Sequence, residues 1–155
     1  MAPGARVGYF IAPPSLRAEL EATSISIYIT PGLLGQATVY EFTRRGKFDA
    51  NLERIRDLLR ARRDAMLEAL EGELGGTSAA WSRPDGGYFV WLELPGVDVA
   101  DLLGRSAEAG VTFVPGTDFG GAASTARLAY SFVSPDEIRE GVPRLAALLP
   151  TAATL

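Results

Sequence analysis

The sequence has 155 residues, the length of one ordinary domain or of a large piece of a bigger protein, and its 47% hydrophobic and 22% charged residues are typical of a folded chain. It contains no cysteine and no histidine, which excludes disulfides, thiol nucleophiles, histidine metal sites and serine–histidine triads from these residues. The net charge of −4 argues against nucleic-acid binding, and no apolar run reaches the roughly 18–20 residues that cross a bilayer. The N-terminus shows no secretory signal pattern, so we expect a cytoplasmic protein that contacts neither nucleic acid nor membrane and holds no metal.

The first third of the chain predicts one strand and two helices. Residues 6–12 form a short apolar run that two prolines end, which is typical of a buried strand. A helix is expected at residues 15–23, capped by its first serine, and the β-branched residues 24–29 favour a continued helix or an irregular bend. A threonine–proline pair predicts the start of a second helix over residues 30–44.

Residues 49–74 carry the strongest helix signal in the chain. Apolar residues recur there at spacings of three, four and seven, which places them on one face of a helix. At 1.5 Å per residue, the stretch from residue 51 to 74 is about 36 Å long, a length at which a helix often joins two domains. The apolar stripe comprises Leu52, Ile55, Leu59, Met66, Leu70 and Leu74.

The second half of the chain reads as strand, strand, helix, strand, strand, helix. A Pro-Asp-Gly-Gly turn joins the first two strands, an aspartate caps the first helix, and a Ser-Pro-Asp-Glu capping box opens the last one. This order predicts an α/β fold of the α+β kind, a small and mainly antiparallel sheet covered by helices. The strands are expected at 78–83, 88–94, 111–115 and 126–133, and the helices at 99–109 and 134–149.

Two arginines stand where an anion would be bound. Arg6 follows a Pro-Gly turn at the mouth of the predicted strand 6–12, where its planar guanidinium could hold a phosphate or carboxylate, although an exposed terminal arginine would look the same. Arg127 interrupts a predicted strand that is otherwise apolar or small, and a buried guanidinium needs an anionic partner. A ligand carboxylate and a structural ion pair would both satisfy Arg127, and the sequence leaves that choice open.

The other chemically interesting residues have simpler interpretations. The aromatic run after the turn at 84–87 is interpreted as a tight turn followed by core aromatics. Pairs of carboxylates on the helices are typical of caps and solvated faces. Fourteen of the fifteen basic residues are arginine, and the single lysine, Lys47, lies in a polar turn between two predicted helices, where we expect it to be exposed.

Five segments in register resemble the C-terminal part of fold-type I, pyridoxal-phosphate-dependent aminotransferases of class I/II. The resemblance is to the branch with aminoadipate, aromatic and valine-pyruvate aminotransferases, and to the aminotransferase-like halves of certain bacterial regulators. It covers nearly the whole chain, to about Leu149. The segments are Ala2-Pro3-Gly4-Ala5-Arg6-Val7-Gly8-Tyr9, Arg62-Arg63-Asp64-Ala65-Met66, Pro84-Asp85-Gly86-Gly87-Tyr88-Phe89-Val90-Trp91-Leu92, Gly110-Val111-Thr112-Phe113-Val114-Pro115-Gly116 and Arg127-Leu128-Ala129-Tyr130-Ser131-Phe132.

The resemblance implies roles for four residues. Arg6 matches the arginine that binds the cofactor phosphate, and Arg127 matches the arginine that binds the substrate α-carboxylate. Tyr88 and Phe119 lie in segments that shape the substrate side-chain pocket in this family. The cofactor of the parent enzyme would be pyridoxal 5'-phosphate, and its substrates an amino acid and a 2-oxo acid.

One family residue has no counterpart in the sequence. The lysine that forms the Schiff base with the cofactor precedes the Pro-Gly-x-Arg segment and would lie two residues ahead of Met1. No catalytic residue is therefore assigned, and we expect the 155 residues alone to bind no cofactor and to be inactive. Residues 1–48 are expected to be a remnant of the large cofactor-binding domain with its linking helices, and residues 49–155 the C-terminal small domain, including the long helix 49–74.

Three functions remain open on this evidence. The first is the C-terminal domain of an aminotransferase, and the second is the effector domain of a bacterial transcription regulator of similar fold. The third is an interaction module without catalysis, and other reactions on the same fold, such as decarboxylation, also remain open. Since residues 6–11 and the long helix would lack the partners supplied by the large domain, we expect self-association or a homodimer.

Overall fold

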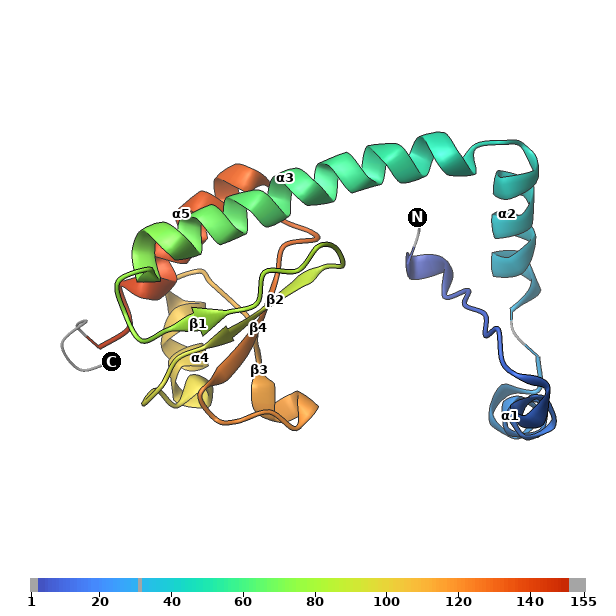
Figure 1. Ribbon diagram of the computed structural model, residues 1–155, viewed down its shortest axis with the longest axis horizontal. Helices are drawn as coiled ribbons and strands as arrows, with labels where there is room; N and C mark the ends of the chain where they lie inside the picture. Colours follow the sequence, from blue (N-terminus) through green and yellow to red (C-terminus); the bar gives the residue numbers. More distant parts are fainter. Residues whose placement is uncertain (1–2, 31, 151–155) are drawn as a thin grey trace. The chain divides into compact units, whose positions relative to one another are not determined.

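The computed structural model describes residues 3–30 and 32–150 (Figure 1). The chain divides into two compact units, Met1–Ile55 and Arg56–Leu155. The long helix α3 (Phe48–Leu74) begins in the first unit and ends in the second.

The first unit holds a short 3₁₀ turn, η1 (Pro3–Ala5), and two helices, α1 (Pro14–Tyr28) and α2 (Leu33–Arg44). The strand predicted at residues 6–12 is wrong: the segment is irregular, and Tyr9, Phe10 and Ile11 are at least 85% exposed. A strand needs a neighbour to accept its backbone hydrogen bonds. Among the residues that the structure describes, no strand pairs with this segment.

Both predicted helices of the first unit are present with shifted starts. α1 continues to Tyr28, which confirms the first of the two alternatives for residues 24–29. Its N-cap is Pro13, with Pro14 in the first turn, so the predicted serine cap is wrong. α2 begins at Leu33 rather than at the predicted threonine–proline pair, whose proline lies outside the described residues. A glycine with φ +65° follows α2, as the predicted helix end requires.

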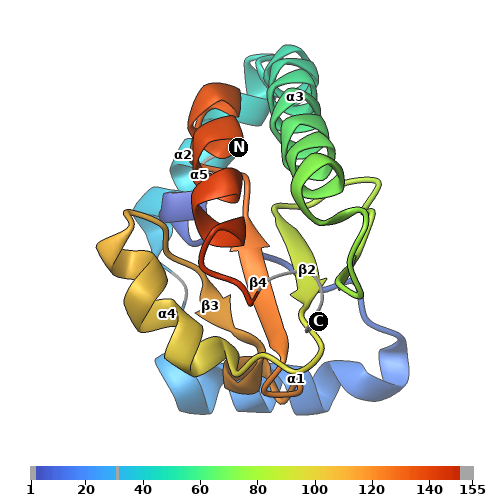
Figure 2. The same cartoon turned by 90° about the vertical axis from the view of Figure 1, so that its left-hand side faces the viewer.

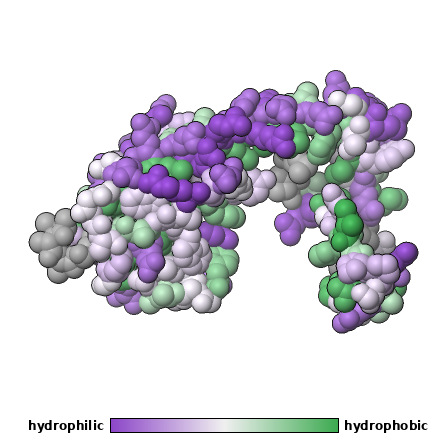
Figure 3. Space-filling model, in the orientation of Figure 1, coloured by the Kyte–Doolittle hydropathy of each residue, from purple (hydrophilic) through white to green (hydrophobic). Residues whose placement is uncertain are grey.

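Helix α3 confirms the longest predicted helix, 49–74: it begins one residue earlier and ends at the predicted residue. Its C-terminal half buries the predicted stripe, with Met66, Leu70 and Leu74 at most 6% exposed. The solvent-facing side of the helix is covered by hydrophilic residues along its length (Figure 3). The helix therefore contributes one apolar face to the core of the second unit and leaves its charged face in water.

The second unit is built on a four-stranded antiparallel sheet with the strand order β1-β2-β4-β3. All four strands are shorter than predicted, because only part of each apolar run pairs with a neighbouring strand. They are β1 (Ala80–Trp81), β2 (Phe89–Glu93), β3 (Val114–Pro115) and β4 (Thr125–Ala129). The central pair, β2 and β4, is matched over five residues, so it sets the register of the whole sheet.

Helices α4 (Val99–Glu108) and α5 (Pro135–Ala146) begin at the predicted caps. The Asp98 carboxylate accepts hydrogen bonds from two backbone N–H groups of α4, and Ser134 and Glu137 form the predicted capping box. Figure 2 shows α3 and α5 side by side over the sheet, with α4 next to β3. Buried residues of all three helices join one cluster with Val90, Leu92 and the apolar side chains of β4.

The order of strands and helices from β1 to α5 and the mixed α/β class agree with the sequence prediction. All three helices pack on one face of the sheet, because the buried residues of β2 and β4 alternate with more exposed ones. Within residues 3–30 and 32–150, no helix is both long enough and apolar enough to span a membrane. Among the described residues of this unit, no α-helix covers the opposite face of the sheet, and the candidate site lies there.

Candidate functional site

The Arg127 side chain lies on the open face of the sheet between two aromatic rings. Its guanidinium carbon lies 4.1 Å from the ring centroid of Phe89 and 4.1 Å from that of Phe119. A guanidinium over an aromatic face is attracted by the ring quadrupole, by about 0.5–2 kcal/mol per ring depending on burial. The two rings come from different segments, β2 and the loop after β3, so the tertiary fold creates this arrangement.

The strand register places these side chains together. Arg127 is directly opposite Trp91 on β2 and opposite Val114 on β3. Residues opposite each other in an antiparallel pair point to the same face, and Phe89 on the same strand shares that face because it lies two residues from Trp91. The alternate residues, such as Val90 and Leu128, point into the core instead.

Arg127 has no anionic partner in the described part of the chain. Its Nε atom is buried without a hydrogen-bond acceptor, and the ion pairs found among residues 3–30 and 32–150 do not include it. A partly buried cation without a partner is costly unless a ligand supplies the negative charge. The sequence left two interpretations open; the structural ion pair is not found among the described residues, and the ligand carboxylate stays a prediction.

The loop that carries Phe119 is held close to the sheet by two glycines. The 3₁₀ turn η2 (Gly116–Phe119) ends at a glycine in the left-handed conformation. A Cβ on Gly116 would lie 2.9 Å from the Cβ atom and the carbonyl oxygen of Thr125, and a Cβ on Gly121 would lie 2.8 Å from the Trp91 ring. Only glycine permits these approaches, and they keep the Phe119 ring 6.3 Å from the Trp91 ring and on the guanidinium.

The Tyr88 ring packs against Phe89, the residue whose ring contacts Arg127. Its ring packs edge-on against Phe89 at 6.2 Å, and both side chains are about 40% exposed. The interpretation of the run after the turn as core aromatics is therefore wrong for Tyr88 and Phe89, since the core is filled by Val90 and Leu92. Phe89 is not among the predicted site residues, although the two-residue alternation of exposure along β2 separates its side chain from the core.

The other two basic residues singled out from the sequence lie in the first unit. Arg6 is exposed, has φ +52° and makes no hydrogen bond or ion pair with a described residue. Lys47 is exposed between α2 and α3, as predicted, and its backbone N–H donates to the Phe42 carbonyl. Arg127, Phe119 and Tyr88 thus gather within the second unit, and Arg6 belongs to the other.

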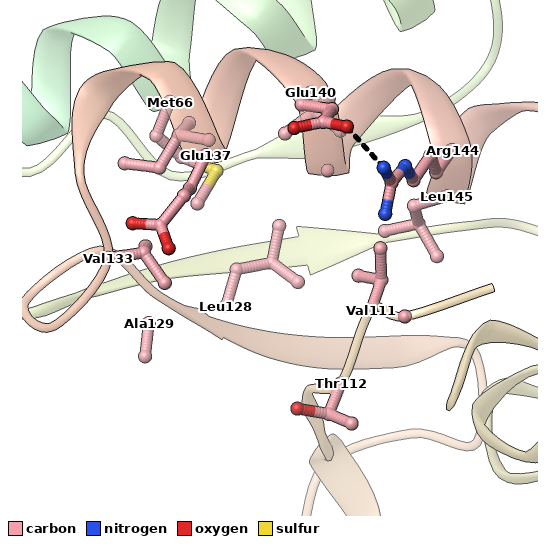
Figure 4. A pocket seen from close by; sticks show the side chains of 14 residues that line it. Met66, Val111, Thr112, Leu128, Ala129, Val133, Glu137, Glu140, Arg144 and Leu145 are labelled. Carbon is pink, nitrogen blue, oxygen red and sulfur yellow. Dashed lines mark hydrogen bonds and ion pairs between the residues drawn. The ribbon is translucent and has the colours of Figure 1, made fainter. Parts of the chain in front are cut away.

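A cavity of about 390 Å³ lies on the opposite, helical side of the sheet (Figure 4). It is bounded by α5, β4 and the segment before β3, and Leu128, Val111 and Val133 give it an apolar floor and walls. Glu140 and Arg144 pair with each other at its rim. The predicted site residues do not line this cavity, and in the described residues no group of three acidic side chains could hold a metal ion.

Comparison with known proteins identifies the family. The family model described as "Aminotransferase class I and II" matches residues 1–145. The chain belongs to the class I and II aminotransferase family. An aminotransferase relative, aromatic-amino-acid aminotransferase 1 of Thermococcus litoralis, is 35% identical over 150 residues, which cover 94% of this chain and 36% of that protein.

Solved aminotransferases share the fold as well as the sequence. The crystal structure of the α-aminoadipate aminotransferase LysN from Thermus thermophilus, complexed with N-(5'-phosphopyridoxyl)-L-leucine, has a TM-score of 0.86 and 37% identity. That match covers 96% of this chain and 39% of LysN. The chain thus spans well under half the length of the aminotransferases that it matches.

Transcriptional regulators match the chain too. The HTH-type transcriptional regulator TauR of Rhodobacter capsulatus is 35% identical over 152 residues, which cover 95% of this chain and 31% of the regulator. The chain is therefore similar to aminotransferases and to a transcriptional regulator, and these matches do not separate the two.

Proposed function

We propose that this chain supplies the carboxylate-binding domain of a pyridoxal-phosphate-dependent aminotransferase, which moves an amino group between an amino acid and a 2-oxo acid. The observation that supports this most directly is Arg127, a guanidinium held between two rings with no acid beside it in the described chain. Its family relatives include an aromatic-amino-acid aminotransferase and a 2-aminoadipate transaminase.

The ring stacking gives the guanidinium a fixed plane. The ring centroids of Phe89 and Phe119 each lie 4.1 Å from the guanidinium carbon, and a guanidinium stacked on both rings would present its N–H groups at its edge, where a planar carboxylate meets them with two parallel hydrogen bonds. The rings also exclude water from the faces, which strengthens an ion pair at the edge. Tyr88 and Phe119, both partly exposed, would then border the space for the substrate side chain.

For the cofactor, the chain offers one ligand. Arg6, exposed and without a partner among the described residues, has the donor set that suits a phosphate group. Lys47 lies in a helix–helix turn remote in sequence from the Arg6 segment, so we assign it no covalent role. Bound pyridoxal phosphate would supply the electron sink and carry the amino group, whereas the residues of this chain bind and orient the anionic ends of cofactor and substrate.

Kinetics of a complete enzyme test the role of Arg127. We would join the chain to the remaining part of LysN, which is 37% identical over the shared region, and compare Arg127→Ala with Arg127→Lys. Loss of a charge-assisted bidentate pair is expected to raise KM for amino and 2-oxo acid by roughly 10- to 100-fold. Arg127→Lys should recover only part of the loss, because an ammonium neither stacks between rings nor forms a planar fork.

A matched control uses an arginine of the same unit. Arg139 is an exposed residue of α5 that pairs with Asp136 at 2.9 Å, and Arg139→Ala should leave both KM values unchanged. Unchanged KM values for Arg127→Ala, in a joined protein that turns over both substrates, would contradict the role.

The second candidate is the effector domain of a transcription regulator, which the TauR match favours. Because this part of the chain is alike in the two classes, the residues around Arg127 do not discriminate between them. Sequencing the DNA upstream of the Met1 codon would discriminate between the two classes. An open frame that encodes a DNA-binding domain ahead of the aminotransferase-like part indicates a regulator. In either case we place the protein in the cytoplasm and expect it to form a homodimer or to self-associate.

A further inference from the structure

The turn between β1 and β2 is held by side chains from outside it. Arg63 on α3 donates from Nη1 to the carbonyl oxygens of Pro84 and Asp85, at 3.4 and 3.2 Å. The Tyr130 hydroxyl donates to the carbonyl oxygen of Gly86 at 3.2 Å. Three successive carbonyls of one turn are therefore satisfied by two side chains, so the turn does not depend on its own backbone hydrogen bonds for its shape.

Arg63 is itself locked in place. Its Nε and Nη2 atoms donate to one carboxylate oxygen of Asp64 at 2.8 and 2.7 Å, and its side chain is only 21% exposed. The guanidinium thus spans from its own helix to the turn in one fixed plane. It crosses a hollow of about 320 Å³ between α3 and the turn, lined also by Gly86, Gly87 and Tyr130.

The turn leads within three residues to the aromatic ring on which Arg127 stacks. After Gly86 the chain passes Gly87, at φ +91°, and Tyr88, whose carbonyl accepts from the Tyr130 N–H at 3.0 Å. Phe89 follows, and its ring covers one face of the Arg127 guanidinium. Phe89 thus lies three residues along the chain from the Gly86 carbonyl that Tyr130 holds, so a displacement of the turn would be passed to the Phe89 side chain through two intervening residues.

We propose that Arg63 is a positioning residue for the carboxylate site: it fixes the turn at residues 84–86 and, through the turn, the Phe89 ring that orients Arg127. The inference rests on the proposed function, because it assigns Arg63 to the site that Arg127 forms. Arg60, one turn earlier on α3, pairs instead at 2.7 Å with Asp57 of its own helix.

The Arg127 side-chain N–H signal in a ¹⁵N-labelled sample of the 155-residue chain tests the proposal. This Nε–H lies against two rings and is buried, so ring currents should move its proton resonance upfield and its exchange with water should be slow. In Arg63→Ala the resonance should move towards those of exposed arginines and its exchange should accelerate by about tenfold or more. Arg63→Lys, which keeps one donor for the turn, should restore part of the shift, and the control Arg60→Ala should leave the signal as in the wild type.

An unchanged Arg127 signal in a folded Arg63→Ala chain would overturn the proposal. If Arg63→Ala does not fold, the same Arg127 signal is measured in Arg63→Lys and in Tyr130→Phe. An Arg127 signal that is unchanged in both variants would also overturn the proposal. Titration of the wild-type chain with pyruvate separates the carboxylate-binding role of Arg127 from the positioning role of Arg63. A wild-type Arg127 signal that does not shift when pyruvate is added would contradict the carboxylate role of Arg127. The effect of Arg63 substitutions on the signal without pyruvate tests the positioning role by itself.

Discussion

At the scale of single residues, the site depends on polar atoms placed beside apolar surfaces. The Arg127 guanidinium gains attraction from two rings but leaves one N–H without an acceptor, and Tyr130 buries a phenol whose hydroxyl has a single partner at Gly86. A group in such a position binds its missing partner more tightly than an exposed one would, because it has already lost its water. The same burial makes the stability of the domain depend on the ionisation of Tyr130.

Tyr130 should make the folded state sensitive to alkaline pH. Burial raises the pKa of the Tyr130 phenol above its ordinary value of 10.0, and the positive charge of Arg63 opposes that rise in part. A pKa that is higher in the folded than in the unfolded state contributes stability that is full below pH 10 and is lost as the pH rises through the folded pKa. Urea unfolding of the wild type should therefore show a falling free energy of unfolding from about pH 9–10 upward.

Tyr130→Phe separates this effect from general alkaline damage. The variant should lose roughly 0.5–1.5 kcal/mol at neutral pH with the hydrogen bond to Gly86, and it should lose less additional stability at high pH than the wild type does. Tyr88→Phe, which removes a hydroxyl from a partly exposed side chain, should keep the wild-type pH profile. Parallel profiles for wild type and Tyr130→Phe would show that Tyr130 does not cause the loss.

At the scale of elements, close backbone approaches position the η2 loop. A methyl group at Gly116 would overlap the Thr125 side chain and backbone, so the loop or strand β4 would have to shift. We expect Gly116→Ala to lower the free energy of unfolding by about 1–3 kcal/mol and to weaken the contact of Phe119 with Arg127. Gly104→Ala, in the middle of α4 with open space around it, is the matched control and should stabilise by about 0.5–1 kcal/mol. Equal effects at the two positions would contradict the role of the close approach.

The capping box of α5 should be sensitive to acid. The backbone N–H of Ser134, followed by the Ser134 side chain, holds the pKa of the Glu137 carboxyl below its ordinary value of 4.5. A pKa that is lower in the folded state contributes stability that is present above the unfolded pKa and is lost as the pH falls through the folded one. The wild type should therefore lose stability below about pH 4.5 more steeply than Glu137→Gln, measured by urea unfolding from pH 3 to 7. Asp136→Asn, which removes the carboxylate next to Glu137, serves as the control.

These elements also show what the sequence could predict. α4 and α5 begin at the expected residues because their caps are local: a side chain satisfies N–H groups two or three residues away. The strand at residues 6–12 was wrong because a strand is defined by a neighbour, and an apolar run does not reveal whether one is present. Stacking of Arg127 on Phe89 and Phe119 depends on register and on a loop, so the sequence could indicate that Arg127 needed a partner but not which rings would cover it.

At the scale of the whole molecule, stability is unevenly distributed between the two units. Every buried hydrophobic residue in the described chain lies between Ala65 and Leu145, and α2 has no buried residue. Isolated helices of about 12–15 residues are marginal in water without a packed face. The exposed apolar residues of the first unit, including Phe10, Ile11 and Leu34 at 83–90% exposure, therefore require another surface to become stable.

Hydrogen exchange measured at several protein concentrations tests whether that surface is a second copy of the chain. Backbone amides of β2 and β4 should be protected at every concentration, because they form the core pair of the sheet. Amides of α2 should exchange almost freely in dilute solution and become protected as the concentration rises, since association stabilises only the folded helix. Leu34→Gln should shift that transition to higher concentration, whereas Phe132→Gln, a change at an equally exposed residue of the second unit, should not. Protection of α2 that is the same at all concentrations, together with a monomer by sedimentation, would show that self-association does not stabilise the first unit.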